Sequence, residues 1–205
     1  MENILFKISY PAEFHAQTAV EAAVILHQET KDKGFNNIDK IVITTHKSAI
    51  RIISKEGKLN NPADRDHCIQ YMTAIGLLKG NLIAEDYEDN VASDPLIDSL
   101  RSKMVVEEDP RYSKEYLEAD KRSIANAIKI YFSDGSSSDK VEVEYPVGHK
   151  KRREEGIPIL IEKFKTNLAT QFSDSRVDEM YSLCLDQSTL EATLVSDFMN
   201  LLVAE

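Results

Sequence analysis

The segment of residues 60–80, NNPADRDHCIQYMTAIGLLKG, constrains the fold more than any other part of the chain. Asn61 can cap a helix that has Pro62 at its first position, and Asp64 places a negative charge in the first turn. Apolar residues then recur every three or four positions, at Cys68, Ile69, Met72, Ile75 and Leu78. This spacing predicts one amphipathic helix over residues 61–80, with one side facing a core.

Three titratable side chains lie along the same predicted helix. Asp64, His67 and Tyr71 stand at positions i, i+3 and i+7, so they would share one stripe at the edge of the apolar face. A carboxylate, an imidazole and a phenol beside an apolar wall suit proton transfer to a small polar substrate. A hydrogen-bonded structural rim has the same spacing, so the pattern leaves a catalytic and a structural role open.

The composition excludes several classes of protein. The 205 residues carry a net charge of −10, which disfavours nucleic acid and membrane surfaces as partners. Cys68 and Cys184 are the only cysteines and lie far apart, so we expect no iron–sulfur or zinc site and no metal. No apolar run approaches the ~20 residues of a membrane span, and no secretory leader pattern follows Met1. We therefore expect a cytoplasmic protein with free thiols.

The N-terminal region predicts an extended arm followed by a helix. Ile4, Phe6 and Ile8 alternate as in a short strand or extended arm, which ends before Pro11. A helix is predicted from about residue 14 to residue 31, with Gly34 as its stop.

Lys7 in the arm, with His15 and Gln17 at the entry to that helix, can converge near one helix N-terminus. Such an end attracts carboxylates, and a lysine adds a point charge for them. A solvated lysine and a capping histidine explain the same residues, so both interpretations stay open.

The middle of the chain predicts strands and short helices. Residues 38–45, IDKIVITT, form a β-branched strand that ends in an exposed turn at His46 and Lys47, and residues 49–53 can extend it. Asp94 and Pro95 start a helix through Arg101. Residues 104–107 are predicted as a strand, and residues 109–121 as a mostly irregular loop. The acidic run within residues 83–90 indicates a solvated face rather than a metal site, because it lacks the ligand spacing and glycine of a calcium loop.

Residues 126–133 and 140–145 predict an antiparallel hairpin, because apolar residues alternate on both sides of the turn that begins at Asp134 and Gly135. We expect this hairpin to pair with the strand at 38–45 and the helix from Asn61 to pack on the resulting sheet. Strands separated by helices of uneven length favour the α+β class over a parallel doubly wound sheet.

The last quarter of the chain changes character. Residues 149–153, HKKRR, are the only basic concentration, and they suit either a solvated linker or a hinge that attracts anions. Helices are predicted from Pro158, after Asp174, and after a capping box formed by Ser188 and Glu191. About fifty residues are near the lower limit for an independent core, so these helices should dock on another surface.

Five strings carry a resemblance to a known family. They are FKISYPAEFHAQTAVEAA, NNPADRDHCIQYM, EDYEDN, KRSIANAI and VEYPVGH followed by RR and EGIP. Together they closely resemble the C-terminal portion of the MmgE/PrpD family over nearly the whole chain. The resemblance implies a cofactor-independent hydro-lyase that eliminates water from 2-methylcitrate to give 2-methyl-cis-aconitate in propionate breakdown.

The resemblance also implies an architecture and a site. Residues 1–149 would form an α+β lid domain, and residues 150–205 would complete a helical domain whose long N-terminal portion this chain lacks. The family's site lies between the two domains. Lys7 and Tyr71 fall where related enzymes place substrate-facing residues, whereas the family argument is weaker for His15 and His67. Lys7 would bind a carboxylate, with His15 and Gln17 nearby, and Tyr71 and His67 would orient or protonate the substrate.

Two hypotheses follow. The chain is either the lid-bearing part of a dehydratase for a small tricarboxylate, truncated or encoded apart from its helical half, or a binding and assembly module that kept the fold without the chemistry. By itself it should be inactive. Its unpartnered helices predict a homodimer.

Overall fold

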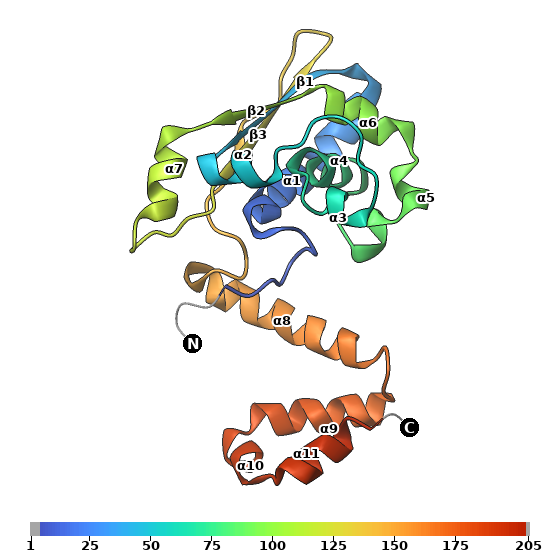
Figure 1. The fold of residues 1–205 in the computed structure, drawn as a ribbon, viewed down its shortest axis with the longest axis vertical. Coiled ribbons are helices and arrows are strands. Elements are labelled where there is room, and N and C mark those ends of the chain that lie inside the picture. The colour runs from blue at the N-terminus through green and yellow to red at the C-terminus, as the bar shows by residue number, and fades with distance from the viewer. Residues whose placement is uncertain (1–4, 204–205) are drawn as a thin grey trace. The chain divides into compact units, whose positions relative to one another are not determined.

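The computed structural model describes residues 5–203 and divides into two compact units, Met1–Arg152 and Arg153–Glu205 (Figure 1). The first unit contains all of the sheet, and the second contains only helices. Ile4, which the sequence places in the arm, lies outside the described residues.

The first unit is built on a four-stranded sheet with the order β2-β1-β3-β4. The strand β1 (Ile38–Thr45) runs parallel to β2 (Met104–Glu108) and antiparallel to β3 (Asn126–Phe132). The strand β4 (Val141–Val143) pairs antiparallel with β3 and closes the predicted hairpin. The α+β class and the pairing of the hairpin with residues 38–45 are therefore confirmed.

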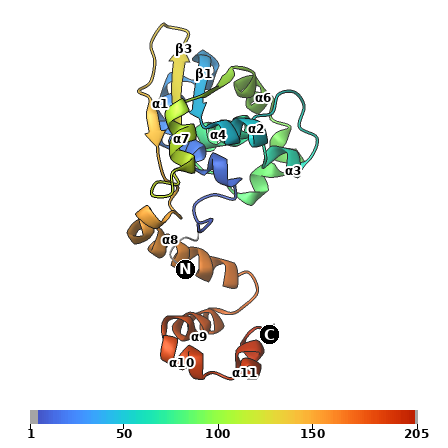
Figure 2. The same cartoon turned by 60° about the vertical axis from the view of Figure 1, so that its left-hand side comes forward.

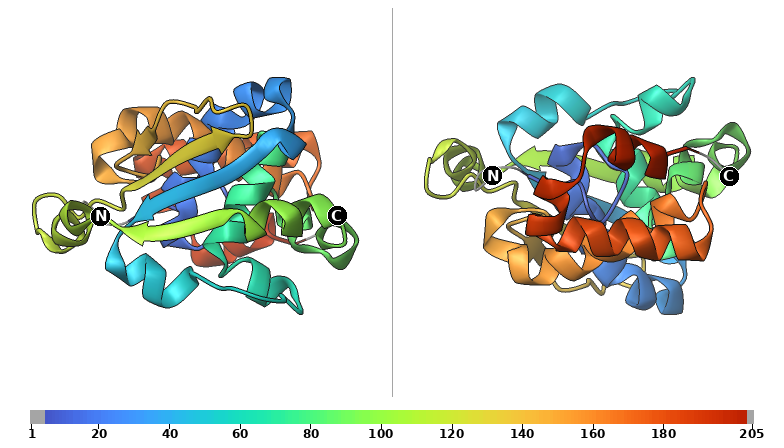
Figure 3. Two further views of the ribbon diagram at one scale, coloured as in Figure 1. Left: turned by 90° about the horizontal axis from the view of Figure 1, so that it is seen from above. Right: turned by 90° about the horizontal axis from the view of Figure 1, so that it is seen from below.

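Two helices form the layer beneath the sheet. The short helix η1 (Phe14–Ala16) leads into α1 (Gln17–Lys33), which ends at Gly34 as predicted. α1 packs against β3, β4 and the helix α4 (Ile69–Lys79), and the view from above shows α1 and α4 on the same side of the sheet (Figure 3).

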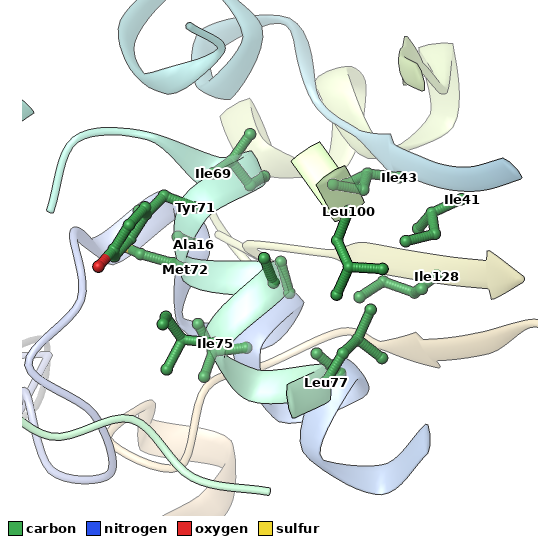
Figure 4. Packing of buried hydrophobic residues seen from close by; sticks show 14 of the residues in the cluster. Ala16, Ile41, Ile43, Ile69, Tyr71, Met72, Ile75, Leu77, Leu100 and Ile128 are labelled. Carbon is green, nitrogen blue, oxygen red and sulfur yellow. The ribbon is translucent and has the colours of Figure 1, made fainter. Parts of the chain in front are cut away.

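The core lies between these helices and the sheet. Met72 and Ile75 of α4 are completely buried and belong to one apolar cluster with Ile41, Ile43 and Ile128 of the strands (Figure 4). Burying one such side chain contributes roughly 1.5–3 kcal/mol. The predicted burial of Met72 and Ile75 is confirmed, but the predicted amphipathic face is wrong, because residues 69–77 are all buried and α4 packs mainly against α1 and α6 (Pro95–Ser102).

Short helices complete the first unit. Asp94 accepts a hydrogen bond from the Leu96 backbone nitrogen (2.9 Å) and so caps the helix predicted there. The short helices are η2 (Phe35–Asn37), α2 (Lys47–Ile53), α3 (Pro62–Arg65), η3 (Ala84–Tyr87), α5 (Asp89–Ala92), α6 (Pro95–Ser102), α7 (Pro110–Leu117) and η4 (Lys150–Arg152).

The helix predicted over residues 61–80 is interrupted, which corrects the sequence pattern. It begins as expected, with the Asn61 side chain accepting from the Asp64 nitrogen (2.9 Å), but α3 ends at Arg65. The backbone at Cys68 is extended, and α4 starts from there. The buried Arg65 guanidinium donates to the Tyr87 carbonyl (2.5 Å) and to Asp89 (2.7 Å). These bonds to distant residues hold α3 as a separate turn, so Asp64, His67 and Tyr71 do not share a helical stripe.

Two other predicted elements are wrong. Residues 49–53 do not extend the strand but belong to α2, because His46 caps a helix at that point. Residues 109–121 are not mostly irregular, because α7 occupies Pro110–Leu117. Asp109 accepts a hydrogen bond from the Arg111 nitrogen (2.8 Å) at its start. The Asp109-Pro110 pair is the same start signal as Asp94-Pro95.

The N-terminal arm is extended but forms no strand within residues 5–10. The Phe6 backbone nitrogen donates to the Gly148 carbonyl (3.2 Å), so the arm lies against the chain that follows the hairpin. A Cβ atom at Gly148 would stand 1.6 Å from the Phe6 carbonyl oxygen. This close approach requires glycine at residue 148.

The second unit contains α8 (Arg153–Leu168), α9 (Asp174–Leu185), α10 (Gln187–Ala192) and α11 (Val195–Leu201). Figure 2 shows α9, α10 and α11 gathered together, and Arg176 of α9 reaches the Asn200 carbonyl at 3.5 Å. Pro158 lies inside α8 rather than at its start, since Glu154 and Glu155 already favour a first turn there. The cap of α10 is Asp186, which accepts from the Thr189 nitrogen (3.1 Å), so the predicted capping box at Ser188 is wrong.

Candidate active site

The site begins with Glu13, which caps the helical entry of the first unit. Its carboxylate accepts a hydrogen bond from the His15 backbone nitrogen (2.8 Å) and contacts the His15 ring nitrogen Nδ1 at 2.7 Å. This bond to His15 holds the pKa of Glu13 below its ordinary value against the opposing effect of burial. An ionised carboxylate can only accept hydrogen bonds, so the Nδ1 atom of His15 carries the proton.

The other nitrogen of His15 faces a tyrosine from a distant part of the chain. Nε2 lies 3.2 Å from the Tyr116 hydroxyl, which α7 provides. With the proton on Nδ1, the neutral ring accepts at Nε2 and Tyr116 donates. Glu13, His15 and Tyr116 thus form a continuous hydrogen-bonded chain.

A second histidine lies behind this chain. His46 follows β1, is completely buried, and accepts a hydrogen bond from the Ala49 backbone nitrogen through Nδ1 (3.4 Å). Its ring stacks on Tyr116 with centroids 4.5 Å apart and planes 11° apart, and its centroid lies 5.1 Å from that of His15. Burial, reinforced by the nearby His15, lowers the pKa of His46 to about 4. His46 is therefore neutral near pH 7.

Lys7 and His67, two further residues of the predicted site, are both exposed. Lys7 is exposed, with its ammonium 5.6 Å from the centroid of the Phe14 ring, directly between Glu13 and His15 in sequence. His67 is exposed in the turn between α3 and α4, and its Nδ1 contacts Asp66 at 2.6 Å. The charge of His67 also contributes to the lowered pKa of Glu13, so His67 lies within electrostatic range of the cluster.

Gln17 and Tyr71 use their polar groups inside the fold. The Gln17 amide donates to the carbonyls of Tyr10 (2.7 Å) and Ala12 (2.8 Å), and so fixes the bend of the arm. The Tyr71 hydroxyl donates to the Asp86 carbonyl (2.6 Å), and burial raises the pKa of Tyr71 to about 12. Tyr71 also lines a groove of about 340 Å³ that Arg65 and Arg101 border.

Comparison with known proteins identifies the family. The sequence model of the MmgE/PrpD C-terminal domain matches residues 10–187. The chain belongs to the MmgE/PrpD family. Curated 2-methylcitrate dehydratases from Escherichia coli (strain K12) and Cupriavidus necator are 53% identical over 205 residues and 54% identical over 203 residues. These alignments cover 99% and 98% of this chain.

A mitochondrial 2-methylcitrate dehydratase from Yarrowia lipolytica is 56% identical over 182 residues, which cover 88% of this chain and 35% of the relative. The bacterial alignments cover 42% of each relative. The chain therefore spans about two fifths of the length of these curated MmgE/PrpD proteins.

Three members of the cluster were not found from the sequence of this MmgE/PrpD chain. No sequence signal pointed to Glu13, because this residue caps only one short helical turn. His46 was predicted in an exposed turn, which is wrong, because its side chain is completely buried. Tyr116 was hidden in the segment predicted as irregular. The helix-start pair Asp109-Pro110 was the one signal that could have placed Tyr116 on an element.

The arrangement suits acid–base chemistry. His15 carries a proton on Nδ1 toward Glu13 and an accepting Nε2 toward Tyr116. Within residues 5–203 no three His, Cys, Asp or Glu side chains are placed to hold one metal ion. The same residues include no helix that is long and apolar enough to cross a membrane.

Proposed function

We propose that this chain is the C-terminal part of a 2-methylcitrate dehydratase, a hydro-lyase that eliminates water from 2-methylcitrate to give 2-methyl-cis-aconitate in propionate catabolism. The observation that carries the proposal is 53% identity over 99% of the chain to the dehydratase of Escherichia coli (strain K12). The hydrogen-bonded cluster of the half-buried Glu13, His15 and Tyr116 supports it. Elimination needs a group that accepts the α-proton and a group that protonates the leaving hydroxyl.

In this proposal the side chains have separate roles. Lys7 binds a substrate carboxylate. His15 binds the substrate, or exchanges a proton with it, after Nε2 exchanges its hydrogen bond to Tyr116 for one to the substrate. His67, in electrostatic range of Glu13, orients the substrate or protonates it. Tyr71 and Gln17 remain proposed site residues. To contact the substrate, either side chain would have to give up its hydrogen bond inside the fold and form a new one to the substrate.

The proposal includes a layout and partners. Residues 1–149 act as a lid domain. Residues 150–205 complete a helical domain whose larger, N-terminal portion comes from sequence outside these 205 residues. The protein needs no cofactor, acts on a small tricarboxylate in the cytoplasm, and associates as a homodimer. The exposed apolar side chains of the second unit support the homodimer.

The test compares the chain alone with the chain reconstituted. The chain is mixed with the N-terminal three fifths of the Escherichia coli relative, and the absorbance of the unsaturated product is followed after 2-methylcitrate is added. We expect no turnover by the chain alone, because catalytic geometry requires both walls of a site, and measurable turnover after mixing. Binding of 2-methylcitrate by the mixture without turnover would instead support a binding module.

Two variants of the mixture test the roles of single residues. Lys7→Ala should raise KM about tenfold, as expected for loss of one charge-assisted hydrogen bond, whereas Tyr71→Phe should chiefly lower kcat. Lys31→Ala, an exposed lysine at the far end of α1, is the matched control and should leave both constants unchanged. If Lys7→Ala and Tyr71→Phe both behave like the control, neither residue belongs to the site.

A further inference from the structure

We propose that Tyr116 and His46 are positioning residues for His15: Tyr116 bonds His15 at Nε2, and the buried ring of His46 fixes the Tyr116 ring by stacking. The inference deepens the proposed function, since it rests on His15 being a site residue. The proposed function itself requires no role for Tyr116 or His46.

Each of the two ring nitrogens of His15 has its own hydrogen-bond partner. Glu13 contacts Nδ1 at 2.7 Å, and the Tyr116 hydroxyl lies 3.2 Å from Nε2. The side chains of Glu13 and His15 are only 16% and 13% exposed, so solvent offers few competing partners. Both ring nitrogens are thereby engaged, and one tautomer with an accepting Nε2 is selected.

The hydroxyl of Tyr116 can serve His15 both as a donor and as an acceptor. A phenol oxygen can donate one hydrogen bond and accept others. It donates to Nε2 while His15 is neutral, and it can accept from Nε2–H after His15 takes up a proton, by rotation of its own O–H bond. Tyr116 therefore supports both protonation states of His15 without a movement of its ring.

The ring of Tyr116 is held by stacking on His46. α7 is short, and Tyr116 stands one residue before its end, so the helix alone gives little restraint. The stacked His46 ring, 4.5 Å away and tilted by only 11°, supplies a flat surface on the inner side. His46 is in turn anchored through Nδ1 to the Ala49 nitrogen (3.4 Å) at the start of α2.

The charges around the cluster favour this assignment. Glu13 is the anion that faces His15, Lys7 lies over the neighbouring Phe14 ring, and the buried His46 is uncharged near pH 7. A neutral His46 does not repel a proton on His15, whereas a charged one at 5.1 Å would. The stacked pair can thus restrain the His15 ring without placing a charge beside it.

The test is NMR of the chain labelled with ¹⁵N and ¹³C in histidine, without substrate. In the unmodified chain we expect His15 to show the Nδ1–H tautomer and a hydrogen-bonded Nε2. Tyr116→Phe keeps the ring and removes only the hydroxyl, so the Nε2 resonance should move to that of a ring nitrogen without a partner. Glu13→Gln removes the carboxylate that Nδ1–H faces, so the Nδ1 resonance of His15 should also move.

The role of stacking is tested by a rescue. His46→Leu removes the flat ring and should reproduce the Nε2 change of Tyr116→Phe, whereas His46→Phe restores a flat ring and should return the unmodified resonance. Tyr131→Phe, a half-exposed tyrosine on β3, is the control and should change nothing at His15. Backbone amide spectra report whether each variant folds.

Two results would overturn the inference. An unchanged Nε2 resonance in Tyr116→Phe means that the hydroxyl does not bond His15, and an unchanged resonance in a folded His46→Leu means that stacking positions nothing. Neither result depends on turnover. The dehydratase proposal is therefore tested separately, by reconstitution.

Discussion

At the scale of single residues, the environment of a side chain matters more than its type. The chain has five histidines; burial keeps His46 neutral near pH 7, whereas His67 is exposed beside Asp66. Burial disfavours the charged form of an imidazole because the protein interior solvates the charge poorly. The same environment makes His46 a determinant of stability at acid pH.

We expect the first unit to lose stability as the pH falls from 6.5 toward 4. The pKa of His46 is lowered from 6.5 to about 4 in the folded chain, so in this window the unfolded chain binds one more proton. The free energy of unfolding should be highest above this window and fall by roughly 3 kcal/mol across it from His46. Glu13, whose pKa is also lowered, acts in the same direction below its ordinary value.

Urea unfolding at a series of pH values checks this expectation. His46→Asn keeps an acceptor that can cap α2 but does not titrate, so its stability should depend less on pH in this window. Equal pH dependence of the two proteins would show that His46 does not carry the effect.

A second residue-scale prediction concerns Gly148. Gly148→Ala should destabilise the first unit by about 1–3 kcal/mol or more, because the new Cβ would stand 1.6 Å from the Phe6 carbonyl oxygen. Gly135→Asn is the control, since asparagine tolerates positive φ and no atom lies within 4 Å of a Cβ at residue 135. Thermal unfolding of both variants decides, and equal melting temperatures would contradict the close approach.

At the scale of elements, caps determine where the short helices lie, and distant bonds determine where they stop. Asp94 and Asp109 each precede a proline and cap α6 and α7 through a backbone nitrogen two residues on, at 2.9 and 2.8 Å. α6 buries Ile97 and Leu100 in the main core, whereas α7 presents Tyr116 to His15. Two chemically identical caps thus hold elements with different tasks.

This pair of caps gives a matched experiment. Asp94→Ala and Asp109→Ala should each lower the free energy of unfolding by about 1 kcal/mol. Only Asp109→Ala should also weaken the hydrogen bond between Tyr116 and His15 Nε2, because only α7 carries a member of the site. A change at His15 in both variants, or in neither, would contradict the role given to α7.

At the scale of the whole molecule, the two units differ in how they treat apolar side chains. The first unit has a continuous buried core, but the second leaves several large apolar side chains exposed and fully buries few, among them Val177 and Met180. The exposed side chains of the second unit are Ile157, Ile159, Leu185, Leu194, Val195, Met199, Leu202 and Val203. Apolar surface of this kind favours association.

We therefore expect the chain to self-associate through the second unit. A dimer would recover about 25 cal/mol for each Å² of apolar surface that it buries. Val195→Lys, at a side chain that is 78% exposed, should shift the sedimentation coefficient toward the monomer, and Phe164→Glu should do the same. Val105→Lys, at an exposed valine of β2, is the control. A monomer at every concentration would contradict the expectation.

The sequence by itself determined the elements whose signals are local. The alternation in β3 and β4, the β-branched run of β1, and the proline caps of α3 and α6 depend on neighbouring residues, and each was predicted correctly. The burial of Met72 and Ile75 followed from their periodicity. Of the predicted site residues Lys7, His15, Gln17, His67 and Tyr71, only His15 belongs to the observed cluster, and the place of all five in a functional site stays a prediction.

Only the tertiary structure decided the rest. The interruption after Arg65 depends on bonds to Tyr87 and Asp89, more than twenty residues away, and the conversion of residues 49–53 to a helix depends on the cap by His46. The cluster joins His15 to Tyr116 across 101 positions of the chain. Residue spacing describes contacts within one element. A contact between elements depends on how their surfaces pack, and this packing brought Glu13, His15, His46 and Tyr116 together.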